Sequence, residues 1–139
     1  MAALTVLVRA LLHRTKPRHG HDRRIALAQS AYYLLTGVWP LVSLKTFEAV
    51  TGPKTDRWLV QTVGLLAAST GAGLAYGAHR GRVAPETRTI AVLSALSFAA
   101  IDVYYVYRRR IAPVYLLDAV AEAALAAAWL RTSARGDER

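Results

Sequence analysis

Charge is segregated along this sequence, and the segregation restricts the possible folds more than any other feature. Four apolar windows hold 80 of the 139 residues but only three of the 27 Asp, Glu, Lys and Arg side chains. A soluble helical bundle needs a charged outer face on every helix, which these windows lack. Each window matches the ~20 residues that cross a ~30 Å hydrocarbon core, so the sequence predicts an integral membrane protein. The windows are 25–44, 58–78, 89–107 and 111–130.

The net charge of +9 and the absence of cysteine exclude several other classes of protein. The basic residues lie at the ends of the apolar windows, where lipid headgroups account for them better than nucleic acid, so no nucleic-acid partner is expected. Without cysteine there is no disulfide, thiolate metal site or cysteine nucleophile. Arg outnumbers Lys by 15 to 3, which is typical of GC-rich bacterial genomes. We therefore expect the chain in a bacterial cytoplasmic membrane.

Residues 1–24 precede the first window as a basic amphipathic segment. Four apolar residues fall on one helical stripe, and residues 13–24 hold five Lys or Arg and three His. A secretory signal has its charge before the apolar run, which is the reverse order. We therefore expect an interfacial helix whose basic neck binds anionic lipid; a start codon farther downstream is the alternative. The stripe consists of Leu4, Leu7, Val8 and Leu11.

The predicted fold is all-α: a polytopic, left-handed four-helix membrane bundle in residues 25–130, followed by a polar tail in 131–139. The short turn at 108–110 makes the third and fourth spans a tight antiparallel hairpin. The N-terminal segment, second loop and tail carry 12 Lys or Arg, against 6 in the first and third loops, so both termini are predicted to be cytoplasmic. Tryptophans at span ends are expected to anchor the helices at the interface: Trp39, Trp58 and Trp129.

Glycine and proline predict local features of the first two spans. Gly37 and Pro40 predict a bend in the first span, whose helix is expected to continue as far as Gly52. Small residues recur along the second span and include a GxxxG motif, which allows close approach of two backbones. We expect this stripe to pack against another span of the same chain, with homodimerisation as the alternative. Its members are Gly64, Ser69, Gly73 and Gly77.

The three acids inside the windows carry the chemical signal of the sequence. A carboxylate costs ~2.5–3.5 kcal/mol to insert at a helix centre, and intramembrane ionisable residues are functional by default. Counting across the 108–110 turn places Asp102 level with Asp118, and Glu122 one helical turn deeper on the same face. The same counting predicts a polar seam inside the bundle, with its mouth on the non-cytoplasmic side. Its further members are Tyr33, Gln61, Tyr105 and Tyr115.

Three interpretations of these acids remain open. The acids are structural if Lys45 or an Arg of 108–110 reaches inward to pair with Asp102 and Tyr or Ser hydroxyls satisfy the other two. Otherwise they form a ligand or cation site, or transfer protons. No cofactor is expected, and no nucleophile motif, phosphate-binding loop or metalloprotease pattern assigns a catalytic residue. No metal site is expected either, because the histidines lie in the solvated basic neck. They are His13, His19 and His21.

Two runs within residues 29–66 carry a resemblance. They are YLLTGVWPL at 33–41 and TFEAVTGPKTDRWLVQTVG at 46–64. This block resembles one found in small, uncharacterised bacterial four-span membrane proteins, loosely similar to the DoxX group in size and architecture. The resemblance covers about a quarter of the chain and implies the four-span architecture, with no known activity. Small multidrug transporters differ, because they carry a Glu in the first span and this first span has none.

The predicted function is binding without catalysis. The leading hypothesis is a bundle that binds a small amphipathic or cationic ligand, or a partner helix, at the acidic seam. One alternative is a proton-coupled small-molecule transporter that acts as a homodimer, assembled through Gly73 and Gly77. Another is an isomerase-type membrane enzyme that uses the acids for acid/base chemistry.

Overall fold

The described part of the chain is all-helical. The computed structural model describes residues 19–134, and within that range it contains five helices and no strand. Most of the predicted interfacial segment, including His13, and most of the polar tail lie outside these residues. The helices are α2 (His19–Val42), α3 (Leu44–Thr51), α4 (Arg57–His79), α5 (Pro85–Tyr107) and α6 (Tyr115–Ala134).

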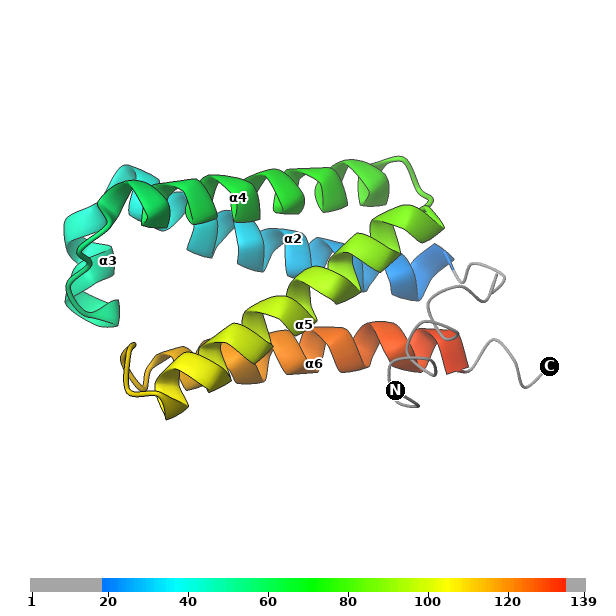
Figure 1. The fold of residues 1–139 in the computed structure, drawn as a ribbon. Coiled ribbons are helices and arrows are strands. Elements are labelled where there is room, and N and C mark those ends of the chain that lie inside the picture. Colours follow the sequence, from blue (N-terminus) through cyan, green and yellow to red (C-terminus); the bar gives the residue numbers. More distant parts are fainter. Residues whose placement is uncertain (1–18, 135–139) are drawn as a thin grey trace.

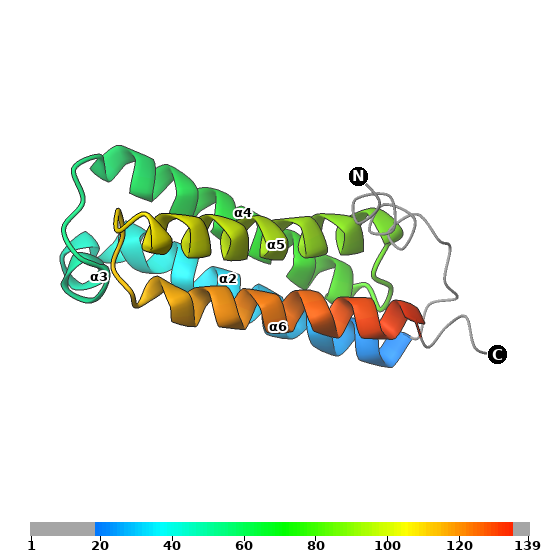
Figure 2. The same cartoon turned by 60° about the horizontal axis from the view of Figure 1, so that its bottom comes forward.

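The four long helices form two antiparallel pairs. α2 packs most closely against α4, and α5 against α6, which confirms the predicted hairpin of the last two apolar windows. The pairs lie against each other along the bundle, and the short α3 turns across one end (Figures 1 and 2). A cluster of buried residues joins all four long helices toward the opposite end. It consists of Ala26, Leu74, Ala78, Ala91, Val92 and Trp129.

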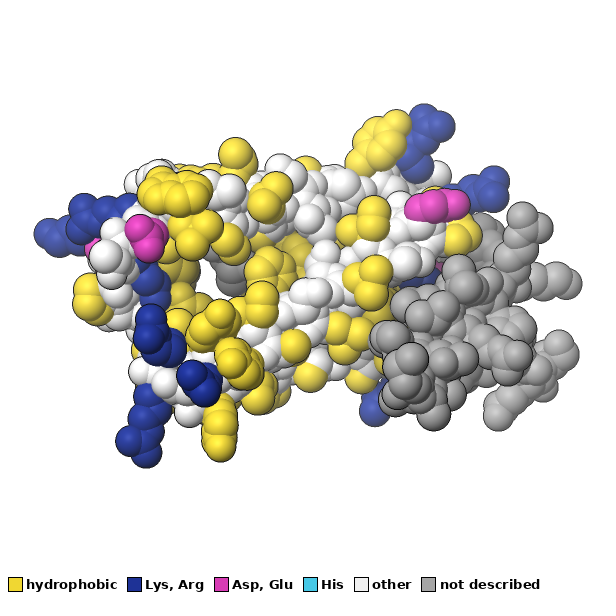
Figure 3. Space-filling view, in the orientation of Figure 1, with side chains coloured by type: hydrophobic (Ala, Val, Ile, Leu, Met, Phe, Trp, Pro, Cys, Tyr) yellow, Lys and Arg dark blue, Asp and Glu magenta, His cyan; other side chains and the backbone are white. Residues whose placement is uncertain are grey.

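Three of the long helices are long and apolar enough to cross a membrane. They are Gly20–Val42 within α2, together with α4 and α5. Their outer faces are apolar, as at Leu35, which is 74% exposed. Figure 3 shows hydrophobic side chains over the middle of the molecule and Lys and Arg gathered toward its ends. This distribution suits lipid and is the reverse of a soluble surface. α6 is of similar length but carries three charged residues, Asp118, Glu122 and Arg131.

Glycines bring α2 and α4 together, at positions that differ in part from the predicted stripe. A Cβ added to Gly37 would lie 2.5 Å from the carbonyl oxygen of Gly64, and one on Gly71 would lie 3.0 Å from that of Ser30. These contacts need residues without a side chain. By contrast, a Cβ on Gly73 would meet nothing within 4 Å.

The prediction of packing within the chain is therefore right for Gly64 and wrong for Gly73. Gly77 lies beside α5, where an added Cβ would contact the Thr87 side chain at 3.5 Å. Ser69 is exposed, and its hydroxyl donates to the carbonyl of Leu65 on its own helix at 2.8 Å. The literal GxxxG motif thus begins on the outer face of α4.

The helix of the first span does not continue to Gly52, as the sequence predicts, but ends at Val42. α2 stops at Val42, and Ser43 caps a separate helix, accepting a hydrogen bond from the Thr46 amide at 3.4 Å. Serine competes for backbone hydrogen bonds at helix starts, so the chain turns here and does not continue one long helix. Trp39 holds α3 in place, because its indole donates to the Thr46 hydroxyl at 2.8 Å and packs edge-on against Phe47.

Glu48 fixes the turn from α3 into α4. One carboxylate oxygen accepts from the Lys54 amide at 3.1 Å, and the other pairs with Arg57 at 3.4 Å. Gly52 ends α3 with a φ of 84°, a conformation that favours glycine. This turn brings Lys54 over the ring of Tyr115, 4.8 Å from its centroid, and so ties the first hairpin to the start of α6.

Candidate functional site

The hairpin of α5 and α6 brings the intramembrane acids together. Asp102 on α5 interacts directly with Asp118 on α6, as the counting across their turn predicts. Glu122 lies one turn farther along α6 and is 2% exposed, while Asp102 is 5% exposed. The three carboxyl groups, called here the acid cluster, therefore occupy neighbouring positions inside the bundle.

Tyr33 on α2 joins the acid cluster from the other helix pair. Its hydroxyl donates to Glu122 Oε2 at 3.0 Å, and its ring packs edge-on against Phe98 of α5, with centroids 5.7 Å apart. The side chain is 1% exposed. The predicted proximity of Tyr33 to Glu122 is confirmed, and the pair supplies a hydrogen-bond donor to a carboxyl that burial would otherwise leave unsatisfied.

Tyr32, its neighbour, is the residue that sequence reasoning missed. Its hydroxyl donates to Asp118 Oδ1. Adjacent residues of a helix point about 100° apart, so one turn of α2 presents phenols to two carboxyls that lie one turn apart on α6. The available signal was the tyrosine pair itself, inside an apolar window opposite two acids.

No basic side chain among residues 19–134 pairs with the acid cluster. The ion pairs in that range join Arg57 to Glu48 and Arg88 to Asp22. The structural alternative is therefore met only in part: neither Lys45 nor Arg108–Arg110 pairs with Asp102 in the described structure, whereas tyrosine hydroxyls satisfy the other two acids. Asp102 Oδ2 is buried and accepts no hydrogen bond from the described residues. Buried polar atoms nearly always have a hydrogen-bond partner, so a buried carboxylate oxygen without a donor is unusual.

The predicted mouth of the seam is not assembled. Gln61 is exposed on α4, and Tyr105, 43% exposed, packs edge-on against Tyr104. Tyr115 is half-buried beneath Lys54. The glycine contacts hold this end of α4 against α2, away from α5 (Figure 1). Figure 3 shows the surface hollowed beside α3, between α4 and the other pair.

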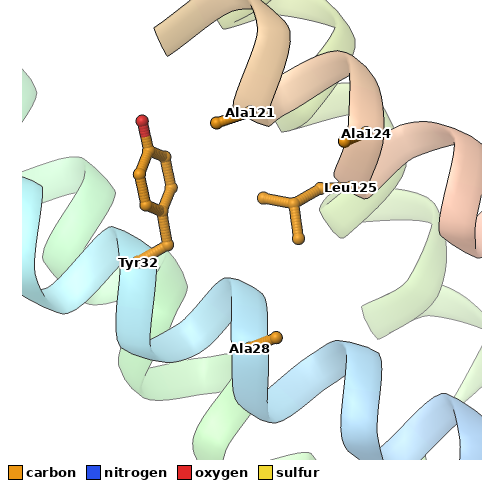
Figure 4. Close-up of a pocket in the computed structure, with 5 residues that line it drawn as sticks. All are labelled: Ala28, Tyr32, Ala121, Ala124 and Leu125. Carbon is orange, nitrogen blue, oxygen red and sulfur yellow. The ribbon is translucent and has the colours of Figure 1, made fainter. Parts of the chain in front are cut away.

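An apolar groove lies beside the acid cluster, between α2 and α6. It has a volume of about 350 Å³ and is open along one side. Its wall combines one aromatic ring with small or aliphatic side chains (Figure 4). Tyr32 connects the two features, because its ring lines the groove and its hydroxyl bonds Asp118. The lining residues are Ala28, Tyr32, Ala121, Ala124 and Leu125.

Beyond Tyr33, polar side chains continue toward the α4–α5 loop. Gln29 lies one turn from Tyr33 on α2, donates to the Ala91 carbonyl at 2.9 Å and accepts from the Trp129 indole at 2.7 Å. Trp129 is 0% exposed, so its predicted role as an interface anchor is wrong. A glutamine within an apolar window was the signal for this buried partner.

Arg88 closes this end of the bundle. Its guanidinium donates to the Trp129 carbonyl and to the Thr132 hydroxyl, and lies 3.9 Å from Asp22 Oδ2. One cation thus links α5 to both α6 and α2. The tie holds the end of α6 against the starts of α5 and α2.

Residues 19–134 contain no cluster of three or more His, Asp or Glu side chains arranged to hold a metal ion. His21 is exposed at the start of α2. The carboxyl groups of the acid cluster instead provide hydrogen-bond acceptors, and its two tyrosines provide donors. Comparison with known proteins adds nothing to this description, since no protein-family model, curated protein or solved structure matches the chain.

Proposed function

We propose that α6 is a fourth membrane span, beside the three helices that are long and apolar enough to cross. Its 20 residues extend about 30 Å, the thickness of a hydrocarbon core. Leu117 and Val120 are 72% and 68% exposed on its outer face, while Asp118 and Glu122 point inward. Tyrosine partners for both acids lower the cost of placing them in lipid.

We also propose that both termini face the cytoplasm, in a bacterial inner membrane. The excess of Lys and Arg in the N-terminal segment, the α4–α5 loop and the tail supports this orientation. A relationship to small four-span bacterial membrane proteins, DoxX-like in size, belongs to the same proposal. In this architecture the acid cluster lies within the membrane. A fold alone does not assign a function, so the function must come from the residues of the site.

Within this architecture, we propose that the protein binds a small amphipathic cation without chemical turnover. One observation carries the proposal: the acid cluster has no cationic partner among residues 19–134 and lies beside an open apolar groove. A cationic head complements the carboxyl groups, and an apolar tail fits the groove through their shared residue, Tyr32. A volume of about 350 Å³ is that of a small-molecule site rather than of a docked helix.

Binding of dodecylammonium tests this function. The purified chain in phosphatidylcholine nanodiscs is titrated by calorimetry, with empty nanodiscs as the blank and dodecanol as the uncharged probe of equal chain length. We expect saturable binding of the ammonium and none of the alcohol. Asp118→Asn and Glu122→Gln should each weaken binding about tenfold, as expected for loss of one charge-assisted contact.

Glu86→Gln is the matched control, because Glu86 is an exposed acid in the first turn of α5, away from the acid cluster. It should bind dodecylammonium as the wild type does. Equal uptake of the alcohol, or equal weakening by Glu86→Gln, would show that the acid cluster does not hold the cation.

A further inference from the structure

We infer that the acid cluster selects cations that donate N–H hydrogen bonds, so that its ligands are protonated primary or secondary amines with an apolar chain. This inference rests on the proposed binding function and names its ligand class. It starts from the hydrogen-bond state of the two facing carboxyls, Asp102 and Asp118, and not from their charge alone.

The two carboxyls offer acceptors in different states. Asp118 Oδ1 already accepts from the Tyr32 hydroxyl, whereas Asp102 Oδ2 is buried and accepts nothing from residues 19–134. A buried acceptor without a donor is costly, so a ligand that supplies one gains affinity. An ammonium group with two or more N–H bonds can satisfy Asp102 Oδ2 and still reach the Asp118 carboxyl. A quaternary ammonium has the same charge but cannot donate.

The limited space around Asp102 also favours an ammonium head over a quaternary one. Asp102 is 5% exposed, and its Oδ2 has almost no accessible surface. Phe98 and Tyr33 fill the neighbouring interior and pack edge-on against each other. A compact ammonium can approach a buried carboxylate at hydrogen-bond distance, whereas methyl groups keep the charge of a quaternary head farther away.

The groove determines what the rest of the ligand must be. Apart from Tyr32, its lining is alanine and leucine, and it opens sideways between α2 and α6. Such a wall provides van der Waals contact and no polar partners, so it accommodates a hydrocarbon chain. The open side lets the chain enter from the surrounding lipid, and Tyr32, which lines the groove and donates to Asp118, leads from the groove to the acid cluster.

Other cations fit less well. Metal ions usually require several converging ligands, and the described residues hold no group of three or more acidic or histidine side chains arranged for one. The groove has the volume of a small-molecule site, about 350 Å³, rather than that of a bed for a whole partner helix. The amine is the ligand that uses both the unpartnered oxygen and the groove.

The decisive experiment compares dodecylammonium with dodecyltrimethylammonium, which share the chain and the charge. Wild-type protein in phosphatidylcholine nanodiscs is titrated with each, and each signal is corrected with empty nanodiscs. We expect the primary amine to bind at least about tenfold more tightly, as expected for a charge-assisted hydrogen bond that only one probe can make. Equal or tighter binding of the trimethyl compound overturns the inference while leaving cation binding intact.

Two further outcomes separate this inference from the function on which it rests. If neither cation binds better than dodecanol, the proposed function fails and the inference with it. Asp102→Asn should reduce the preference for the primary amine at least threefold, whereas the Glu86→Gln control should retain it. An unchanged preference in a folded Asp102→Asn protein contradicts the assignment of Asp102 Oδ2 as the selecting atom. The comparison on wild-type protein stands even if that variant does not fold.

Discussion

Two adjacent tyrosines explain how α6 can hold two acids inside an apolar bundle. Tyr32 donates to Asp118 and Tyr33 to Glu122, so each carboxyl receives a donor from the helix that faces it. Neither bond brings a positive charge into the interior. A neutral donor satisfies the acceptor without supplying a cation. The arrangement therefore differs from a buried ion pair, in which the acids would be occupied.

The Tyr33 bond should contribute measurably to stability. Tyr33→Phe keeps the ring and its contact with Phe98 but removes the donor to the buried Glu122. We expect a loss of about 1–3 kcal/mol in the free energy of unfolding, because a buried acceptor is left unsatisfied. Denaturation by dodecyl sulfate in mixed micelles measures it. Tyr105→Phe is the control, since Tyr105 is partly exposed and its change should cost little; equal losses would contradict a special role for Tyr33.

At the scale of single residues, the predictions that depend only on helix geometry are confirmed. The proximity of Asp102 to Asp118, and of Tyr33 to Glu122, follows from counting along antiparallel helices. The position of Trp129 near a span end predicts an interface anchor, yet the side chain is fully buried and its indole donates to Gln29. Rotation of a helix about its axis depends on the partner it packs against, and a single span does not specify it.

At the scale of elements, the packing of α2 against α4 depends on complementarity between the two helices. Gly64 on α4 contacts the backbone at Gly37 on α2, so a small residue on one helix meets a small residue on the other. The motif at Gly73 and Gly77 has suitable spacing but no equivalent partner on α2. Spacing within one helix identifies candidates for close packing, and the facing helix decides among them.

Alanine substitutions distinguish the two sets of glycines. In Gly64→Ala, the added Cβ would lie 2.6 Å from the Gly37 carbonyl oxygen, so the helices must separate. Overpacking of this kind costs about 1–3 kcal/mol. In Gly73→Ala, the Cβ meets nothing, and stability should stay level or rise by up to about 1 kcal/mol through helix propensity. Dodecyl sulfate titrations of both variants measure the difference.

The opposite order of stabilities would contradict this packing. A loss confined to Gly73→Ala that depends on protein concentration would instead place a homodimer contact on the outer face of α4. That result would support the alternative in which two copies assemble through the GxxxG motif.

The groove between α2 and α6 makes a separate prediction about binding. Ala124→Phe fills the groove without touching a carboxyl group, so dodecylammonium affinity should fall about tenfold, through overpacking of the chain site. Ala123→Phe adds the same ring at an exposed α6 position outside the lining and should leave affinity unchanged. Calorimetric titration in nanodiscs compares the two. Equal affinities in both variants would place the hydrocarbon chain elsewhere.

At the scale of the whole molecule, much of the architecture could be predicted from the distribution of charge. The windows 25–44, 58–78, 89–107 and 111–130 overlap the four long helices, because lipid imposes a length and a composition on any segment that crosses it. The separate helix α3 could not be predicted in this way. Its start depends on the hydrogen bonds of Ser43 and Trp39, which are local and leave no trace in hydropathy.

The crossing of α6 decides the topology, and labelling of single cysteines tests it directly. The chain has no cysteine, so each introduced thiol is the only reactive one. Arg82→Cys, Arg110→Cys and Arg131→Cys place exposed thiols in the α4–α5 loop, in the α5–α6 turn and near the end of α6. A membrane-impermeant maleimide is applied to right-side-out and inverted bacterial vesicles.

With four spans and cytoplasmic termini, positions 82 and 131 should label in inverted vesicles and position 110 in right-side-out ones. If position 131 labels together with position 110, α6 does not cross, and the acid cluster lies at a membrane surface. Water could then supply a donor to Asp102 Oδ2, and the physical reason for selecting an amine would be lost. If the sidedness of all three positions is inverted, four spans remain and the groove is unaffected. The position of α6 in the membrane, more than the orientation of the termini, therefore determines whether the acid cluster can act as a ligand site.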